Sequence, residues 1–497
     1  MFFLINYIEY QLKKSPVLFL LGIALSVRLY NINSPIIGIH SWRQADTAAM
    51  ARNFYENGFN LFYPQIDWGG NSPGYCETEF PIYSFIVSIF YKFFGVHELF
   101  GRLISVTFSL FTIFFLYQLI RTYFNDATAF WSCLWFSILP VSIYYSRTFQ
   151  PESMLLMCSV GGIYYFNKWL ESQKLHLLCI SALFVSLACL IKVLPIIYVG
   201  LPLLFLAYHK FSHKIFTKIY LWLYSLFIII TVALWYYHAH QIFLEYGNTF
   251  GFWGGSSDRY KYDLILKSNF WLQISFRTIV RQFAVLMFPI FIAGLLMKRK
   301  TQQEYLFDIW LLSVVLTWIL APTTSLVHEY YQLPFMLPGV VFIGKFFSKY
   351  FNKNHQGKNI KKFLAICLSL SILTSFTIYS IDYMSKERAN KSKVFQLAEI
   401  VKDKIPSDTL TIFTTGGDPT LLYLSHRKGW MINPRDLNEE YIMSKIQLGA
   451  DYLVGSFDFI QSYKSSLDDM QKNRINTVLS KYPNILHDDS FFIAHLK

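Results

Sequence analysis

The chain has 497 residues, of which 54% are hydrophobic, 19% aromatic and only 15% charged. This composition excludes an ordinary soluble enzyme and predicts an integral membrane protein. The formal charge of +13 lies mainly before residue 384, where 29 Lys and Arg stand against 17 Asp and Glu, compared with 15 against 14 beyond it. An excess of basic residues in the apolar segment before residue 384 can orient the membrane loops and bind anionic lipid headgroups. We therefore expect the lipid bilayer, and no nucleic acid, among the partners.

Eleven apolar stretches are long enough to span a bilayer, which takes about 17 to 25 residues. They are 15–33, 101–122, 126–146, 151–169, 176–192, 193–210, 215–237, 281–298, 305–322, 331–349 and 362–382. A twelfth stretch, 81–96, is short and carries Lys92, which predicts an amphipathic helix lying in the membrane plane. With this assignment, every lysine-rich loop between spans falls on the same side of the membrane. The positive-inside rule then places the N-terminus in the cytoplasm and the C-terminal residues outside it.

This topology predicts two domains in a mainly α, polytopic protein. Residues 1–383 form the transmembrane domain, with long external loops at 34–100 and 238–280, and residues 384–497 form a small extracytoplasmic α/β domain. In the latter, "TLTIFTTGGDPTLLYLSHRKGW" predicts a strand, a Gly-rich turn and a helix, and "FFIAHL" a closing strand. Its "TTGGD" is similar to a phosphate loop but lacks GxGxxG spacing, which favours a tight strand-to-helix turn. The six cysteines are scattered and predict no disulfide framework.

The stretch "HSWRQADTAAMARNF" (40–54) places Asp46 on a predicted helix, with Arg43 one turn before it. The neighbouring alanines are expected to leave an open flank where a substrate can meet the carboxylate. Arg43 can hold the ionised form of Asp46 or bind a phosphate. An ion pair at a helix start is the structural alternative. His40 and Trp42 of this stretch are candidate substrate contacts.

Two further acids, Glu77 and Glu79 in "NSPGYCETEFP", lie in the same predicted loop. Carboxylates in this setting suit general-base chemistry or a divalent cation, and a solvated acidic turn is the alternative. Cations also stand at predicted external membrane boundaries, where ionisable groups are costly and are candidates for binding a lipid-linked phosphate. These cations are Arg102, Arg147 and Lys192. Snorkelling to lipid headgroups is the alternative for each of them.

A polar turn, "APTTSLVHEYYQLPFMLP", links two predicted spans on the external face. Its side chains can hydrogen-bond a polyhydroxylated ligand or hold a metal, although an isolated histidine is more often structural. The candidate residues are His328, Glu329, Tyr330 and Tyr331. The run "GNTFGFWGG" in the second long loop is typical both of sugar-stacking loops and of loops that rest on the membrane interface.

In this order, the motifs resemble those of polytopic GT-C glycosyltransferases, in particular the protein O-mannosyltransferases and the lipid A aminoarabinose transferases. The resemblance is carried by Asp46, "AR" at 51–52, "ETEFP" at 77–81, "KFFG" at 92–95, Arg102, "IKVLP" with Lys192, and "HEYYQLP". Gln150-Pro151 stands where the family carries Asp-Pro, with Glu152 the nearest acid, so both are candidate substrate contacts.

The resemblance implies an inverting transfer of a sugar from a polyprenyl-phosphate donor to a protein, lipid or glycan acceptor at the cytoplasmic membrane. It implies Asp46 as the catalytic base or acceptor-positioning group. Lys192, Arg102, Arg147 and Arg43 are the candidates for the donor phosphate. Glu79 and His328 are the candidate ligands for a divalent metal ion, the one cofactor considered.

Two other functions fit the same composition. A transporter or flippase of lipid-linked saccharides would require an inverted repeat and broken helices in mid-membrane, and the sequence has no clear internal repeat. An oligosaccharide polymerase or ligase would differ in its donor and acceptor.

Overall fold

The computed structural model describes residues 15–250, 261–351, 358–461, 464–465 and 467–497. The chain divides into two compact units. Unit 1 comprises Met1–Ile32, Leu103–Tyr237 and Gly255–Ile381. Unit 2 comprises Asn33–Arg102, His238–Gly254 and Asp382–Lys497, so most of the first predicted external loop belongs with the C-terminal residues.

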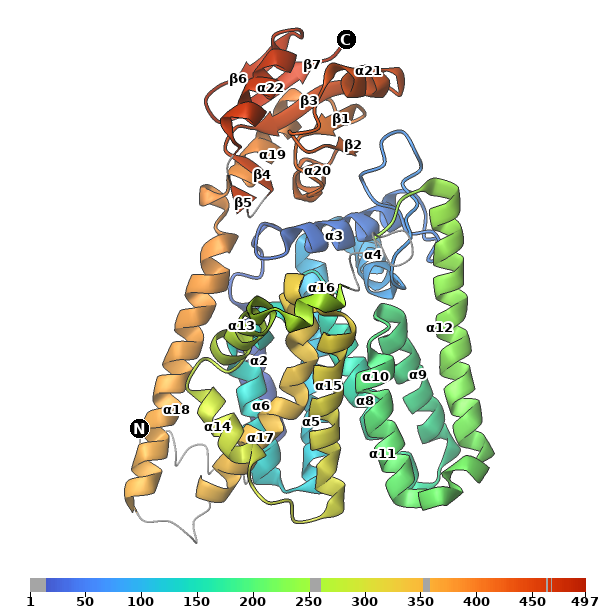
Figure 1. Cartoon of the computed structure of the whole chain (residues 1–497), viewed down its shortest axis with the longest axis vertical. Helices are drawn as coiled ribbons and strands as arrows, with labels where there is room; N and C mark the ends of the chain where they lie inside the picture. The colour runs from blue at the N-terminus through green and yellow to red at the C-terminus, as the bar shows by residue number, and fades with distance from the viewer. Residues whose placement is uncertain (1–14, 251–260, 352–357, 462–463, 466) are drawn as a thin grey trace. The chain divides into compact units, whose positions relative to one another are not determined.

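Unit 1 is helical (Figure 1). Its α-helices are α2 (Pro16–Leu29), most of α5 (Glu98–Tyr123), α6 (Asp126–Ile138), α7 (Pro140–Tyr145), α8 (Glu152–Ser172), α9 (Leu175–Ile191), α10 (Pro195–Tyr198), α11 (Gly200–Phe211), most of α12 (Ile219–Tyr246), α13 (Ser268–Phe276), α14 (Met287–Leu295), α15 (Leu306–Leu320), α16 (Pro322–Val327), α17 (Leu333–Phe351) and α18 (Lys358–Ile378). Shorter 3-10 or π segments are η1 (Ser212–Thr217), η3 (Tyr262–Leu266), η4 (Arg277–Gln282), η5 (Gln302–Tyr305), η6 (Glu329–Gln332) and η7 (Tyr379–Tyr383).

Five of the described helical stretches are long and apolar enough to cross a bilayer: Glu98–Tyr123, Pro195–Thr217, Ile219–Tyr246, Gln302–Leu320 and Ala365–Glu387. A pair bent by 104°, Ser268–Gln282 with Met287–Leu295, would make a sixth. The apolar helices confirm a multi-pass membrane protein, although fewer of them meet this length test than the eleven predicted spans. Proline is one reason, because Pro140 begins a new helix inside the stretch 126–146.

The second predicted loop, 238–280, is largely helical where it is described. Helix α12 continues to Tyr246, and η3 and α13 follow from Tyr262. Residues 251–260, which include most of the "GNTFGFWGG" run, lie outside the described residues.

Small residues allow the helices of unit 1 to pack closely. A Cβ atom on Gly344 of α17 would lie 2.0 Å from Ser132 Oγ of α6. One on Gly294 of α14 would lie 1.9 Å from the carbonyl oxygen of Phe342 on α17. Since lipid tails are as apolar as leucine, such close approach supplies much of the association energy between helices in a membrane.

Unit 2 contains α3 (Ser41–Glu56), α4 (Ile82–Phe94) and a C-terminal α/β fold. Helix α4 is amphipathic, as predicted: Tyr83, Val87 and Tyr91 recur at a spacing of four and are buried, whereas Phe93 and Phe94 are exposed.

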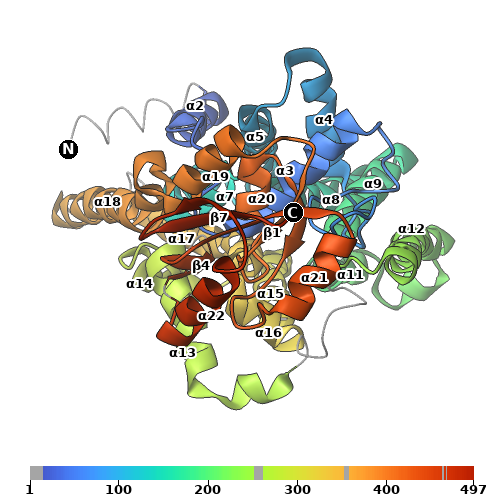
Figure 2. The same ribbon diagram turned by 90° about the horizontal axis from the view of Figure 1, so that it is seen from above.

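The C-terminal sheet has the order β2-β1-β3-β7-β6, formed by β2 (Lys428–Met431), β1 (Leu410–Phe413), β3 (Ala450–Ser456), β7 (Phe491–His495) and β6 (Asn484–His487). β1 runs parallel to β2 and β3, and β7 is antiparallel to β3 and β6. Figures 1 and 2 show α19 (Lys393–Lys404) and α20 (Thr420–Ser425) on one face, and α21 (Glu439–Gln447) and α22 (Asp469–Leu479) on the other. A hairpin of β4 (Phe459–Gln461) and β5 (Lys464–Ser465) follows β3, and the 3-10 turns η8 (Met384–Glu387) and η9 (Ala389–Lys391) precede α19.

The C-terminal fold is bound to the first loop within unit 2. The backbone nitrogens of Gly69 and Gly70 donate to the carbonyl oxygen of Gly429 in β2, at 3.1 and 2.8 Å. Arg52 of α3 pairs with Asp67 at 2.5 Å, and its guanidinium lies over the ring of Tyr423, 5.1 Å from the ring centroid. The sequence predicts these segments as parts of separate domains, because nothing local in either segment indicates that they pair.

We expect Gly70→Ala to weaken this attachment. Gly70 has a φ of +68°, and an added Cβ would lie 1.9 Å from the ring of Trp430. Overpacking of this kind costs about 1–3 kcal/mol, so the variant should have a lower melting temperature in detergent. Gly58→Ala is the matched control, since Gly58 also has positive φ, +101°, but nothing lies within 4 Å of its added Cβ. Equal melting temperatures for the two variants would contradict the contact with Trp430.

Candidate active site

Helix α3 carries the acid that the sequence singled out. Its alanines favour helix and have short side chains, which allows neighbouring segments to pack closely against it. Ala45, Ala48 and Ala49 are buried in the structure. The expectation of an open alanine flank is therefore wrong: the small side chains make room for protein and not for a substrate.

Asp46 is 4% exposed and accepts a hydrogen bond from Trp68 Nε1 at 3.0 Å. Burial raises the pKa of this carboxyl to about 8, and the nearby charge of Asp67 adds to the rise. The hydrogen bond from Trp68 and the charge of Arg43 act in the opposite direction but are outweighed. Burial therefore favours the protonated form of Asp46 at neutral pH and increases the proton affinity of its ionised form.

Arg43, predicted to support Asp46, also contacts other groups. Its Nη2 donates to Glu79 Oε2 at 2.8 Å, and its guanidinium carbon lies 5.1 Å from the ring centroid of Phe250. Trp68 stacks on the same ring with 6.4 Å between centroids. These contacts bring together two carboxyls, a guanidinium and two aromatic rings. We call this group the α3 cluster, and its members are Arg43, Asp46, Trp68, Glu79 and Phe250. His40 and Trp42, at the start of the helix, are half-buried.

Glu77 has a different role from Glu79. It is fully buried and accepts a hydrogen bond from the Thr249 hydroxyl. Its backbone nitrogen donates to the carbonyl oxygen of Asn248 at 3.0 Å, and its carbonyl accepts from the nitrogen of Phe250 at 2.9 Å. Glu77 therefore fixes the segment that carries Phe250 against the first loop, and Glu79 is the acid that belongs to the cluster.

Arg102 is the last residue of the first segment of unit 2 and is fully buried. Its guanidinium is 3.7 Å from Glu387, and Nη2 donates to the carbonyl oxygen of Pro35 at 3.3 Å. Ser34 donates to the same glutamate at 3.2 Å. A phosphate would have to displace these partners, so the placement suits a structural tie better than the predicted donor contact.

In unit 1, Lys192 ends helix α9 and is buried. Its Nζ lies 2.7 Å from Glu152 Oε1, 4.3 Å from the ring centroid of Tyr330 and 4.1 Å from that of Tyr331. An ammonium held over two aromatic faces is stabilised by their quadrupoles. Four of the predicted residues therefore lie together, although they come from three separate parts of the sequence.

Glu329 extends this group. It accepts a hydrogen bond from the hydroxyl of Tyr145 at 3.3 Å and one from Arg281 Nη1 at 3.1 Å. The ring of His328 stacks on Tyr330 with 5.3 Å between centroids, and that of Tyr145 lies 6.0 Å from Tyr330. We call Lys192, Glu152, Tyr145, Arg281 and residues 328–331 the lysine cluster. Sequence reasoning missed Arg281, although an arginine beside an apolar stretch is itself a signal, and it missed Tyr145.

Two other predicted contacts are enclosed in unit 1. Arg147 is fully buried, with Nη2 donating to the carbonyl oxygen of Asn31 at 2.6 Å and Nη1 to the hydroxyl of Tyr379 at 3.3 Å. Gln150 is also fully buried, and its Oε1 accepts from the Thr148 hydroxyl at 3.4 Å. These contacts fix the turn between α7 and α8. None of the partners named here belongs to the lysine cluster, so we do not count Arg147 or Gln150 as part of it.

The metal prediction named Glu79 and His328. Among the described residues, no group of three or more His, Cys, Asp or Glu side chains could hold a metal ion. Glu79 is engaged by Arg43, whose positive charge opposes a cation at the same oxygen. The donor set does not fit a metal site, and we assign no step to a metal.

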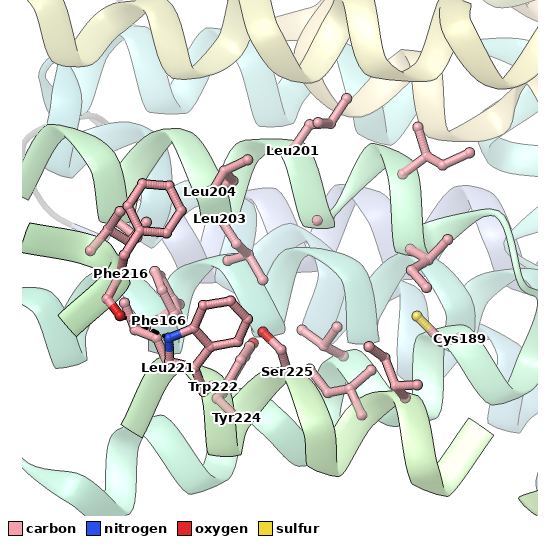
Figure 3. Close-up of a pocket in the computed structure, with 18 of the residues that line it drawn as sticks. Phe166, Cys189, Leu201, Leu203, Leu204, Phe216, Leu221, Trp222, Tyr224 and Ser225 are labelled. Carbon is pink, nitrogen blue, oxygen red and sulfur yellow. Dashed lines mark hydrogen bonds between the residues drawn. The ribbon is translucent and has the colours of Figure 1, made fainter. Parts of the chain in front are cut away.

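An apolar pocket of about 570 Å³ lies elsewhere in unit 1 (Figure 3). Its lining comes from the segment α8 to α12 and from Leu316 of α15, and it includes Phe166, Cys189, Leu203, Trp222 and Tyr224. Such a surface accommodates hydrocarbon and not a sugar or phosphate. No residue predicted for the site is among its lining residues in the described chain.

Comparisons with known proteins agree with this picture. Residues 78–238 match the family model described as dolichyl-phosphate-mannose-protein mannosyltransferase. The fold is similar to that of ArnT from Cupriavidus metallidurans, crystallised with undecaprenyl phosphate, with a TM-score of 0.70, 13% identity, and coverage of 97% of this chain and 98% of that one.

The fold is also similar to that of the archaeal oligosaccharyltransferase AglB from Archaeoglobus fulgidus, in complex with an inhibitory peptide and a dolichol-phosphate. The TM-score is 0.58 at 12% identity, with 89% of this chain and 69% of that one covered. A comparison with curated protein sequences found no match.

Proposed function

We propose that this chain, a multi-pass membrane protein with a fold similar to those of ArnT and AglB, is a GT-C glycosyltransferase that transfers a hexose or pentose from a polyprenyl-phosphate donor to a protein, lipid or glycan acceptor. The reaction takes place on the extracytoplasmic side of the cytoplasmic membrane and inverts the anomeric carbon. The fold relatives support the donor class, since ArnT was crystallised with undecaprenyl phosphate and AglB with a dolichol-phosphate.

The lysine cluster is the proposed site for the donor phosphate. An ammonium has three N–H donors, so Lys192 can keep its contact with Glu152 and still donate to a phosphate oxygen. Arg281 supplies a second cation, and its side chain is 21% exposed. Both cations stabilise the charge that develops on the leaving phosphate as its bond to the sugar breaks.

Asp46 is the proposed general base. The acceptor oxygen or nitrogen attacks the anomeric carbon, and its proton passes to Asp46. At the same time the bond from the anomeric carbon to the phosphate oxygen breaks, and its electron pair leaves with the polyprenyl phosphate. The observation that carries the proposal is the burial of Asp46 beside Trp68, which gives this carboxyl the proton affinity that the step requires.

The pH dependence of transfer tests this role. Membrane vesicles containing the protein are given polyprenyl monophosphate that carries a tritiated sugar, and label in the acceptor fraction is measured from pH 5 to 10. Only ionised Asp46 accepts a proton, so the rate at limiting donor should rise about tenfold per pH unit and level off near pH 8. A rate that is already constant above pH 5 would contradict Asp46 as the base. Uptake of label without transfer would indicate a transporter.

A further inference from the structure

The apolar pocket of unit 1 has no part in the function proposed so far. Figure 3 shows Phe216, Leu221 and Trp222 at one end of this pocket and Cys189 at the other. Three of its lining residues, Leu204, Phe216 and Trp222, are more than half exposed. The lining therefore reaches the outer surface of α11, η1 and α12, where a hydrocarbon chain of the bilayer can enter the pocket.

Positive charge gathers at the Phe216 end of the pocket. Residues 209–218, which we call the basic turn, connect α11 to α12 and carry three lysines and two histidines. Lys210, Lys214 and Lys218 each lie within three residues of a side chain that lines the pocket. Lys210 and Lys214 are exposed, and Lys218 Nζ lies 5.3 Å from the ring centroid of Phe211. The pocket thus has a basic rim at one end.

The segment around the basic turn contains no acid to offset this charge. Between Glu171 and Glu245 the sequence has neither Asp nor Glu. Glu171 itself accepts a hydrogen bond from Lys168 Nζ at 3.0 Å and one from Asn167 Nδ2 at 2.9 Å. A cluster of cations without acids in its own segment creates a positive potential that attracts anions.

Side-chain contacts place the basic turn at the end of unit 1 that the positive-inside rule predicts to be cytoplasmic. Trp169, near the end of α8, packs against Phe211 and Tyr220, with ring centroids 6.0 and 5.3 Å apart. The hydroxyl of Tyr123, at the end of α5, donates to Asn167 of α8 at 2.6 Å. The turn therefore lies with the α5–α6 and α8–α9 connections. The cytoplasmic leaflet is the one that carries anionic phospholipid.

Trp222 marks the boundary between the apolar lining and the basic turn. Its indole Nε1 donates to the carbonyl oxygen of Phe216 at 3.0 Å. Tryptophans are enriched at the level of the lipid headgroups, where the ring lies in hydrocarbon and the N–H meets polar groups. The lysines beside Trp222 in the chain are thus expected at the depth of a phospholipid phosphate.

We propose that this pocket binds an anionic glycerophospholipid of the cytoplasmic leaflet. One acyl chain lies against the apolar lining, and the headgroup phosphate lies among Lys210, Lys214 and Lys218. Basic pockets between transmembrane helices on the cytoplasmic side recognise anionic headgroups in this way. The inference does not depend on the function proposed above, because none of these residues belongs to the α3 cluster or the lysine cluster.

The polyprenyl tail of a donor is the competing occupant, since Cys189, at the other end of the pocket, lies three residues before Lys192. A polyprenyl tail accounts for the apolar lining. It gives no role to the lysines of the basic turn, because a hydrocarbon carries no charge for them to bind. An anionic phospholipid accounts for both the lining and the charge.

Native mass spectrometry of the purified full chain in detergent tests the headgroup contact. Dioleoyl phosphatidylglycerol and dioleoyl phosphatidylcholine, which have the same acyl chains, are titrated separately. The wild type should bind phosphatidylglycerol about tenfold more tightly, and the triple variant Lys210→Gln, Lys214→Gln, Lys218→Gln should lose this preference. The matched control is a second triple variant, which removes the same charge from exposed lysines of other predicted cytoplasmic loops and should keep the preference. It combines Lys298→Gln, Lys300→Gln and Lys349→Gln.

Ser225→Phe tests the position of the acyl chain. Ser225 lines the pocket and is exposed, so the added ring can occupy the pocket without entering the protein core. Both phospholipids should bind about fivefold more weakly to this variant, because the chain loses apolar contact. Leu226→Phe is the control, since Leu226 is the next residue of α12 and is exposed but is not among the lining residues in the described chain. It should bind both lipids as the wild type does.

Three results would overturn the inference. The first is equal binding of the two phospholipids by the wild type, and the second is an equal loss of preference in the two triple variants. The third is displacement of phosphatidylglycerol by an equal concentration of undecaprenol, which has a polyprenyl tail and no phosphate. That result would assign the pocket to the donor tail. All three leave the sugar-transfer proposal to its own test.

Discussion

Asp46→Asn should reduce sugar transfer by about 100-fold to 10,000-fold, because the amide cannot accept the acceptor's proton. The substitution is nearly isosteric, and its side-chain oxygen can still accept the hydrogen bond from Trp68 Nε1. Transfer is measured with tritiated polyprenyl monophosphate donor, and Asp436→Asn, at an exposed aspartate of the C-terminal fold, serves as the control.

The same variant should be at least as stable as the wild type at pH 8. The pKa of Asp46 is raised from 3.8 to about 8 in the folded chain. The stability that this group contributes is therefore complete below about pH 4 and is lost as pH rises through 8. The loss is on the order of a few kcal/mol, and Asp46→Asn does not undergo it. A variant that loses activity because it unfolds would show a lower melting temperature at pH 8, and that result would contradict a catalytic role.

Lys192→Gln should reduce transfer about 100-fold or more. Removing the ammonium takes away one of the two cations proposed to stabilise the leaving phosphate, and it also leaves Glu152 buried without this ion pair. The measurement is the transfer rate over a range of donor concentrations. A rise in the donor concentration needed for half-maximal rate would show that Lys192 also binds the phosphate before the bond breaks.

Lys345→Gln is the matched control for this loss. Lys345 is likewise a buried lysine of unit 1, paired with Glu304 at 3.1 Å and lying 5.3 Å from the ring centroid of Phe124. Both variants lose a buried ion pair and should lose similar stability. Equal losses of transfer in the two would mean that Lys192 acts through folding alone.

The fold class could be predicted because it depends on properties that are local in sequence. The length of the apolar stretches predicts the membrane helices. The alternation of strand, turn and helix signals after residue 384 predicts the C-terminal α/β fold. Helix ends were less predictable, as Pro140 shows by beginning α7 inside a predicted span. The grouping of 33–102 with the C-terminal fold depends on contacts such as Gly70 with Gly429, which join residues far apart in the chain and leave no periodic pattern.

Part of the candidate site could also be predicted, because some of its residues are marked by features that are local in sequence. Lys192 was chosen because it stands at a predicted membrane boundary, Glu152 through the family resemblance, and Tyr330 and Tyr331 as part of a polar external turn. The structure brings these four residues together. Arg102 and Arg147 satisfied the criterion used for Lys192, yet both are enclosed by protein partners. Position along the chain indicates membrane depth but not which neighbour a cation faces. Trp68 was missed because its importance lies in its contacts with Asp46 and Phe250.

Cleavage of the donor is the most direct test of sugar transfer from a polyprenyl phosphate. Purified protein is reconstituted in liposomes with a polyprenyl monophosphate sugar, and phosphorus NMR follows conversion of the phosphodiester to the phosphomonoester in the presence of an acceptor extract. We predict conversion by the wild type that is lost in Asp46→Asn and Lys192→Gln and kept in Lys345→Gln. Movement of the donor between leaflets with its phosphodiester intact would contradict the proposed function.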